Sequence, residues 1–259
     1  MSPPPPQPSR PAATCVIFRR AASGPDEILM QRRSEKLEFA GGMVVFPGGR
    51  VDEADFALAE RFPSLDKSDA AARIAAIRET LEEAGLAIGL ADPIDADQAR
   101  AARAMLDEIG ALEPVLAHFG WMLDLEALTP FARWHPRHAA FKVYDTRFYL
   151  ADLGTGAVDI APDGGETSRL FWASAKDALA MVESGEIGVI FPTLRNLERL
   201  ALFETYADAR RQAESIAIRE ICPVSETRTD GRYLTIPADQ GYPVTEQRFD
   251  TVVRAKAKG

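Results

Sequence analysis

Apolar and polar residues alternate with two different periods along this chain, and the changes of period mark its elements. Residues 12–20 are apolar and β-branched and predict a strand, which a turn at 23–26 joins to a second strand at 27–33. Residues 39–55 carry glycines in pairs and predict a loop, a short strand and another loop. An apolar stripe at helical spacing then follows in residues 68–84.

This helix is the clearest element of the chain. Ser68 or Asp69 can cap its start, and Gly85 stands where a left-handed residue ends a helix. The spacing predicts a core-facing stripe on one side and a single exposed face of carboxylates on the other. The stripe consists of Ile74, Ile77, Leu81 and Ala84, and the carboxylates are Glu79, Glu82 and Glu83.

The remainder of the chain mixes helices and strands, which predicts an α/β fold. There is no internal repeat and no obvious linker, so we expect a disordered, proline-rich tail over residues 1–11 and a single domain over residues 12–259. A helical insertion occupies residues 91–120, approximately, and is expected to cover the substrate or to form a homodimer contact. The predicted helices are 95–108, 112–119, 174–184 and 192–210, and the predicted strands are 123–134, 141–153 and 170–172, with weak strand-like pieces from 221 onward.

Composition narrows the function. The 46% hydrophobic and 27% charged fractions are those of a globular protein. No run of 18 apolar residues occurs, so no membrane-spanning helix is predicted. A net charge of −9 argues against nucleic acid or anionic membranes as partners and leaves a small molecule as the expected one. With only three histidines, a metal is expected to have oxygen ligands. Cys15 and Cys222 fit a reducing cytoplasm.

The three crowded glutamates have two interpretations. Charge runs are usually the solvated face of an amphipathic helix. Like charges at these spacings nevertheless cost a few tenths of a kcal/mol each, and a bound cation would relieve them. Mg²⁺ or Mn²⁺ suits such a set of carboxylates.

The surrounding residues favour the second interpretation. FPGG at residues 46–49 and RETLEEAGL at 78–86 resemble the signature of the Nudix hydrolases, G-x5-E-x7-R-E-U-x-E-E-x-G-U, where U is a bulky aliphatic residue. Gly49 matches the first glycine, but Thr80 replaces an aliphatic residue and Asp55 replaces the first glutamate. Asp55 and Arg78 are separated by 22 residues where the signature has seven. A subgroup that includes peroxisomal acyl-CoA diphosphatases has a box split in this way, and we expect the extra residues to form a surface excursion.

The resemblance implies an α/β/α sandwich with a mixed central sheet. It also implies that Glu82 and Glu83 bind the metal, and that Glu79 is a further ligand or orients the attacking water. Arg78 is then expected to hold a glutamate in place by a charge-assisted hydrogen bond. Gly48 and Gly49 are expected to let metal and phosphates approach the backbone.

The upstream residues resemble the pattern L-L-T-x-R-[SA]-x3-R-x3-G-x3-F-P-G-G of the CoA-cleaving members. This pattern is matched by Leu29, Arg33, Ser34 and Gly42. It differs at Met30 and Gln31, which replace the second leucine and the threonine, and at Glu38, which replaces the second arginine. The expected function is metal-dependent hydrolysis of the pyrophosphate linkage of CoA or an acyl-CoA. The alternatives are another Nudix substrate, such as ADP-ribose, a dinucleotide cofactor or a nucleoside polyphosphate, and a non-catalytic nucleotide-binding module.

Several other residues carry possible site chemistry. Glu166, in the segment GGETSRLFW, is expected to be a base or an extra metal ligand, with a loop glutamate in a polar turn as the alternative. His135 and His138 are three residues apart, but Pro136 disfavours a helix that would pair them, so we expect them to line a loop. The arginines considered for substrate phosphates are Arg32, Arg33, Arg50 and Arg147.

Overall fold

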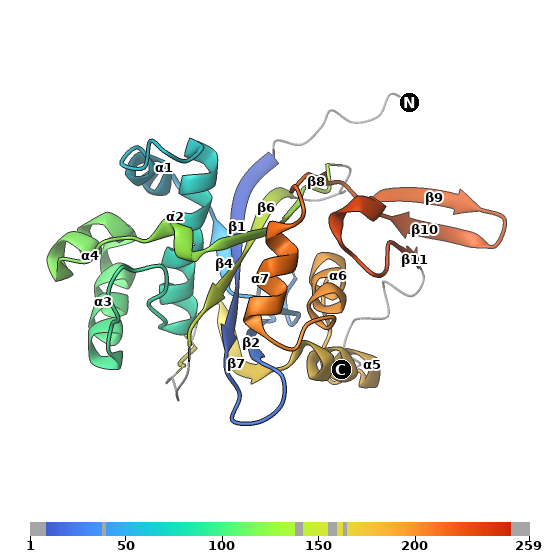
Figure 1. Cartoon of the computed structure of the whole chain (residues 1–259), viewed down its shortest axis with the longest axis horizontal. Helices are drawn as coiled ribbons and strands as arrows, with labels where there is room; N and C mark the ends of the chain where they lie inside the picture. The colour runs from blue at the N-terminus through green and yellow to red at the C-terminus, as the bar shows by residue number, and fades with distance from the viewer. Residues whose placement is uncertain (1–8, 38–39, 138–141, 155–159, 163–164, 250–259) are drawn as a thin grey trace.

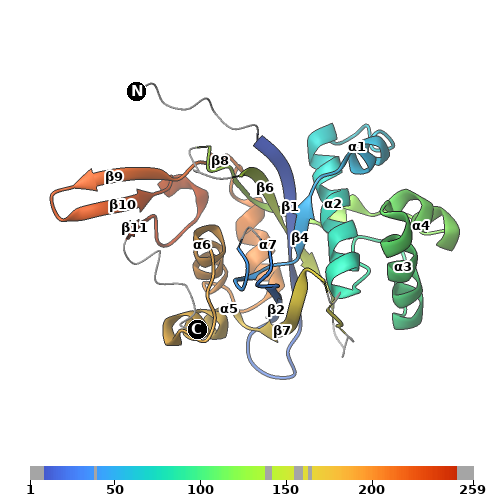
Figure 2. The ribbon, with the colours of Figure 1, turned by 180° about the vertical axis from the view of Figure 1, so that it is seen from behind.

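A mixed β-sheet lies between two layers of helices (Figure 1). The computed structural model of the chain describes residues 9–37, 40–137, 142–154, 160–162 and 165–249. Within these ranges no helix is both long and apolar enough to cross a membrane. The view from behind shows the same three layers (Figure 2), which confirms the α/β/α sandwich predicted from the sequence.

The central sheet has the strand order β3-β2-β1-β6-β5-β8, with β4 paired to β1 and β7 paired to β2. The pairing of β1 with β6 and of β5 with β8 is parallel, and the other pairs in the sheet are antiparallel. The strands are β1 (Ser9–Arg19), β2 (Glu27–Arg33), β3 (Val44–Val45), β4 (Gly48–Arg50), β5 (Thr129–Trp134), β6 (Val143–Asp152), β7 (Thr167–Ala173) and β8 (Glu220–Ile221).

Helices cover both faces of this sheet, and a second, three-stranded sheet extends from one end (Figure 1). The first four helices pack on one face, and the last three on the other. The helices are α1 (Glu53–Ala59), α2 (Lys67–Ala84), α3 (Ala96–Ile109), α4 (Leu112–Phe119), α5 (Ala175–Ser184), α6 (Phe191–Leu200) and α7 (Tyr206–Glu214), with short 3-10 turns η1 (Leu125–Ala127) and η2 (Ala238–Gln240). The small sheet consists of β9 (Val224–Arg228), β10 (Gly231–Thr235) and β11 (Glu246–Arg248).

Helix α2 is buried along most of its length. The predicted core stripe is confirmed, because Ile74, Ile77, Leu81 and Ala84 are all buried. Alanines on the flanks of this stripe are buried too, and their small side chains let α2 lie close to β1. Gly85 ends the helix in the left-handed conformation, as predicted. The cap at its start is Asp66, two residues before the predicted Ser68 and three before the predicted Asp69.

Some predicted boundaries were wrong for reasons of long-range pairing. Strand β1 begins at Ser9 rather than residue 12, because Ser9, Arg10 and Pro11 pair with the start of β6 and therefore do not belong to a disordered tail. The glycine-rich stretch contains two short strands, β3 and β4, rather than one. The first part of the predicted strand 123–134 is the turn η1. The excursion after Asp52 is helix α1, which packs on α2 through Leu58 and Ala59.

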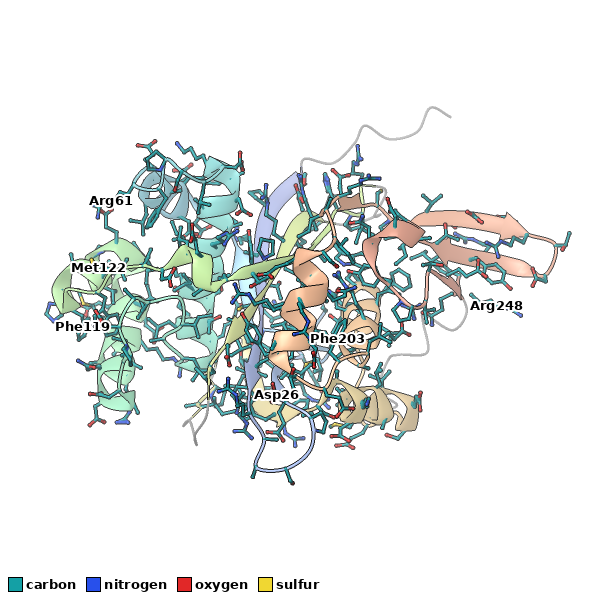
Figure 3. All side chains as sticks on the ribbon, viewed as in Figure 1. Asp26, Arg61, Phe119, Met122, Phe203 and Arg248 are labelled. Carbon is teal, nitrogen blue, oxygen red and sulfur yellow. The ribbon has the colours of Figure 1, made fainter. Side chains whose placement is uncertain are left out.

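The predicted helix 192–210 is two helices, α6 and α7. Thr205 caps α7, and the Asp26 side chain accepts a hydrogen bond from the backbone N–H of Tyr206 at 2.8 Å. Asp26 lies in the turn between β1 and β2, close to the break that holds Phe203 (Figure 3). A contact with a distant segment therefore lies at the start of the second helix, and helical periodicity alone does not reveal it.

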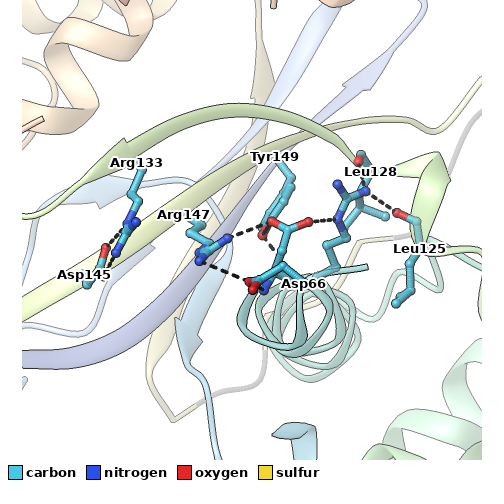
Figure 4. A network of polar contacts seen from close by, with 9 residues as sticks. Asp66, Leu125, Leu128, Arg133, Asp145, Arg147 and Tyr149 are labelled. Carbon is cyan, nitrogen blue, oxygen red and sulfur yellow. Dashed lines mark hydrogen bonds and ion pairs between the residues drawn. The ribbon is translucent and has the colours of Figure 1, made fainter. Parts of the chain in front are cut away.

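A polar network fastens the start of α2 to the sheet (Figure 4). Asp69 accepts hydrogen bonds from Arg73 at 2.7 Å, from Arg147 at 3.0 Å and from the Tyr149 hydroxyl at 2.8 Å. Arg73 also donates to the backbone carbonyls of Leu125 and Leu128, both at 2.7 Å. Because this network is largely shielded from water, removing one of its polar groups leaves the others without a partner at a cost in stability.

Replacing Asp69 with Ala is expected to lower the free energy of unfolding by about 3 kcal/mol, because it leaves buried Arg73 without its carboxylate. Urea denaturation followed by circular dichroism measures this change. Asp97→Ala is the matched control, since its pair with Arg100 is exposed and should contribute little. A loss no greater than that of the control would contradict the assigned role.

Candidate active site

The guanidinium of Arg78 joins two segments that lie far apart in the sequence. Its Nε and Nη2 donate to the two oxygens of Asp55 at 3.1 and 3.0 Å, in the bidentate geometry that arginine and carboxylate prefer. Nη1 lies 3.0 Å from carboxylate oxygens of both Glu79 and Glu82, and Nη2 donates to the backbone carbonyl of Arg50 at 2.8 Å. The side chains of Arg78 and Asp55 are 5% and 1% exposed. The split signature is therefore reassembled in space.

Asp55 reaches this position because α1 starts beside it. Asp52 is the N-cap of α1, and the Asp55 carboxylate accepts a hydrogen bond from the backbone N–H of Asp52 at 2.9 Å, which closes a capping box. The shorter aspartate at this position thus makes both the cap and the Arg78 pair. The 22-residue separation costs the site no contact.

Glu83 is held by hydrogen bonds to one of its oxygens. Oε2 accepts from the side-chain amide of Gln31 on β2 and from the backbone N–H of Gly48 on β4, each at 2.8 Å. In the sequence, Gln31 is visible only as a departure from the motif. Its position directly after three buried apolar residues of the strand was the available signal, because a polar side chain there must find a partner.

Glu79 lies against Gly49. A Cβ on Gly49 would stand 2.3 Å from the Glu79 carboxylate, so any side chain there would displace Glu79 from this position. Burial raises the pKa of Glu79 to about 8; the positive charge of Arg78 opposes this shift, while Glu83 and Glu82 add to it. Burial also raises the pKa of Glu82, against the effect of Arg78. The predicted exposed face of carboxylates is thus wrong in one respect: β4 covers it, and Glu83 is buried.

All nine residues predicted for the site line one cleft of about 820 Å³. This volume is in the range of small-molecule sites. The structure thus brings the predicted residues together, while the role of each stays a prediction. The nine are Arg33, Gly48, Gly49, Arg50, Arg78, Glu79, Glu82, Glu83 and Glu166.

The sequence interpretation missed the floor of this cleft. Strands β1 and β6 run parallel with Ala12 beside Thr146 and Thr14 beside Phe148, so these side chains share one face of the sheet. Gly48 pairs with Thr14 on the other side, which places the glycine strand at the edge of the same floor. Alternation along strands would reveal such a floor only with the register known. Further lining residues that were missed are Arg10, Lys142, Tyr144, Trp134 and Asp107.

The inserted helices border the cleft next to α2. Leu106 and Asp107 of α3 line it, consistent with the expectation that the insertion covers the substrate. Arg103 of α3 donates to the backbone carbonyl of Glu82 at 2.9 Å, near the C-terminus of α2. A cation is favourable there because unpaired carbonyls concentrate negative charge at the end of a helix. The homodimer contact stays a prediction.

Some of the other residues considered from the sequence line the cleft and others do not. Glu166 is largely exposed in the cleft, 3.6 Å from Arg33, which is half-buried. His135 lies 3.3 Å from Glu220 and does not line the cleft, whereas its neighbours Trp134 and Pro136 do. Arg32 donates to the carbonyl of Glu186, Arg147 belongs to the Asp69 network, and neither residue lines the cleft. His138 and Glu38 lie outside the described residues.

The donors at α2 suit a hard divalent cation. Among the described residues, no three acidic, histidine or cysteine side chains already converge as a metal site. The chemistry of the donors nevertheless fits, because Glu79 and Glu82 share the positive charge of Arg78 with Asp55, and Glu83 lies beside them on the same helix. Glu79, Glu82 and Glu83 are therefore the residues that could hold such an ion.

Comparison with known proteins agrees with this geometry. The family model described as NUDIX domain matches residues 8–194. The acyl-coenzyme A diphosphatase NUDT19 of Gallus gallus is 28% identical over 276 residues, covering 84% of this chain and 73% of that protein. Its Xenopus laevis counterpart is 23% identical over 274 residues, covering 84% and 71%. The crystal structure of a NUDIX hydrolase from Alicyclobacillus acidocaldarius superposes with a TM-score of 0.68 at 29% identity, covering 79% of this chain and 96% of the other.

The raised pKa of Glu79 predicts a pH dependence of stability in metal-free protein. Between pH 4.5 and 8 the folded protein keeps a proton on Glu79 that the unfolded chain releases, so stability should fall as pH rises through this range. Thermal unfolding in EDTA at pH 5 to 8.5 measures the decline, and Glu79→Gln should flatten it. An equally steep decline in Glu79→Gln would show that other groups cause it.

Proposed function

Because the chain belongs to the NUDIX family of hydrolases of pyrophosphate linkages, we propose that it cleaves CoA or an acyl-CoA with the help of Mg²⁺ or Mn²⁺. The observation that carries the proposal is the convergence of Arg78, three glutamates and two glycines in one cleft. The choice of substrate is supported by the acyl-coenzyme A diphosphatases of chicken and frog, which resemble most of the chain. The rival substrates are ADP-ribose, a dinucleotide cofactor or a nucleoside polyphosphate.

The reaction adds one water molecule across the pyrophosphate. The water oxygen forms a bond to phosphorus, the bridging P–O bond breaks, and the second phosphate leaves with the bonding electrons. We assign the proton released by the water to the carboxylate of Glu166, which is exposed in the cleft. Glu79 either orients this water or completes the metal ligands.

A divalent cation held by Glu82 and Glu83, with or without Glu79, would neutralise phosphate oxygens and favour loss of the water proton. Gly48 and Gly49 line the cleft, and their lack of side chains lets β1 and Glu79 lie against the backbone there. Arg33 and Arg50 are assigned to the outer phosphate oxygens, for which the planar guanidinium is suited. Arg78 stays with its carboxylates, where it holds Glu79 and Glu82 in place.

A cytoplasmic enzyme is part of the same proposal. Cys15 and Cys222 are both free thiols, and Cys15 is fully buried. Free thiols are at home in a reducing compartment. Fractionation of cells that produce the protein tests this placement directly.

The decisive experiment is a screen of pyrophosphate compounds with Mg²⁺ or Mn²⁺ and identification of the products. From CoA we expect 3′,5′-ADP and phosphopantetheine, and from an acyl-CoA the acylated phosphopantetheine. Faster cleavage of ADP-ribose, a dinucleotide or a nucleoside polyphosphate would transfer the assignment to that rival. Absence of turnover on every compound would favour a nucleotide-binding module instead.

Glu83→Gln is expected to reduce kcat/KM by more than about 100-fold, because loss of an outer partner of a metal ligand already costs 10- to 100-fold. Excess EDTA should abolish turnover. Glu113→Gln on α4 is the matched control, since Glu113 pairs with Arg61 outside the cleft, and its activity should equal that of the native protein. Intact hydrolysis in Glu82→Gln and Glu83→Gln would overturn the metal assignment.

A further inference from the structure

A glutamine side chain is fully buried in the sheet beside the active site. Gln31 is 0% exposed on β2 and directly follows Ile28, Leu29 and Met30, which are also buried. A buried amide without partners costs several kcal/mol in an apolar setting. Gln31 therefore needs its hydrogen bonds, and those bonds point to a purpose other than core packing.

Both ends of the Gln31 amide have partners. Nε2 donates to Glu83 Oε2 at 2.8 Å, and Oε1 accepts from the hydroxyl of Thr167 at 3.3 Å. Since a carboxylate only accepts, Glu83 fixes which end of the amide faces it. Thr167 is 1% exposed, so the bond between Thr167 and Gln31 is shielded from water. The result is a buried chain of donors from Thr167 through Gln31 to Glu83.

An irregularity in the sheet puts Thr167 in reach. Strand β7 pairs with β2 through Gln31–Leu170 and Arg32–Arg169, but the next pair is Arg33–Thr167 and not Arg33–Ser168. Because a shift of one residue turns a side chain to the other face, this bulge gives Thr167 the face that Ser168 would have occupied. That face is the one on which Gln31 lies.

The same chain connects two segments that contribute acidic residues to the cleft. Glu166 directly precedes Thr167, Glu83 lies on α2, and both glutamates line the cleft. On the α2 side, Gly48 donates a second hydrogen bond to the oxygen that Gln31 contacts. Two donors on one oxygen restrict rotation of the carboxylate, while Thr167 restricts rotation of the amide that supplies one of them.

We propose that Gln31 is a positioning residue for a divalent cation: with Thr167 it fixes the orientation of the Glu83 carboxylate. A carboxylate held in one orientation by such a partner binds a metal ion more tightly than one that is free to rotate. The inference rests on the metal site of the proposed function but not on the identity of the substrate. Because the partners of metal ligands typically contribute 10- to 100-fold to affinity, the effect should be large enough to measure directly.

The test measures Mn²⁺ binding to the purified protein by electron paramagnetic resonance and calorimetry, without any substrate. Gln31→Leu, which keeps the approximate size but removes the donor, should raise the Kd for Mn²⁺ by about 10- to 100-fold. Gln240→Leu is the matched control: Gln240 is a buried glutamine that accepts from the backbone N–H of Arg219 on the other side of the sheet. Its Kd should equal that of the native protein. Native affinity in Gln31→Leu would overturn the proposal.

Thr167→Val keeps the proposal testable if Gln31→Leu does not fold. It leaves the amide in place without its orienting hydroxyl, so the Kd for Mn²⁺ should rise by a smaller factor. In the Gln31→Leu background the same change should have no further effect, because the two residues act in one chain. Additive effects of the two substitutions on the Kd would show that Thr167 acts independently of Gln31 and would contradict the proposed chain of hydrogen bonds.

These measurements separate the inference from the proposed function. If Gln31→Leu binds Mn²⁺ more weakly and the native protein hydrolyses none of the tested compounds, the positioning role of Gln31 is supported and the proposed enzymatic activity is refuted. Turnover of CoA with unchanged Mn²⁺ affinity in Gln31→Leu would do the reverse. At saturating Mn²⁺ the variant should recover most of the native kcat, which a general loss of structure would not permit.

Discussion

The active site depends on one buried positive charge. Arg78 is shared by Asp55, Glu79 and Glu82, and Asp55 is almost completely withdrawn from water. Removing one partner of a buried pair costs about 3–5 kcal/mol, because the other charge stays without compensation. The guanidinium thus contacts both the start of α1, through Asp55, and the carboxylates of α2. One arginine cannot neutralise three carboxylates, and this remaining imbalance is what a divalent cation would correct.

Strand β4 lets the carboxylates of α2 approach the backbone of the sheet because it carries Gly48 and Gly49. Carboxylates on α2 would normally be separated from the far face of the sheet by a row of side chains. In β4 that row is missing at Gly49, where Glu79 lies against the backbone, and at Gly48, whose N–H contacts Glu83. The cleft can therefore combine acidic groups from one helical layer with a floor made by the opposite face of β1 and β6.

Local features of the site were predictable from the sequence, and its long-range contacts were not. The stripe of α2 and the end of the helix at Gly85 follow from the spacing of residues close in the chain. The pairing of Ser9 with β6 and the break between α6 and α7 depend on residues more than 100 positions away. Gln31 illustrates the same limit, because its partner Thr167 comes within reach only through the bulge in β7. Periodicity identifies faces, while register and tertiary contacts decide what meets them.

The excursion between the two halves of the signature has a practical side. Asp55 and Arg78 are joined through their side chains, so the intervening polypeptide only has to leave α1 and return to Asp66. Pro63 and Ser64 lie exposed in that connection, and loop closure becomes only slowly more costly with length. This turn is therefore a place where a fluorescent reporter or an affinity handle could be grafted into the chain, next to α2 yet outside the contacts of Arg78.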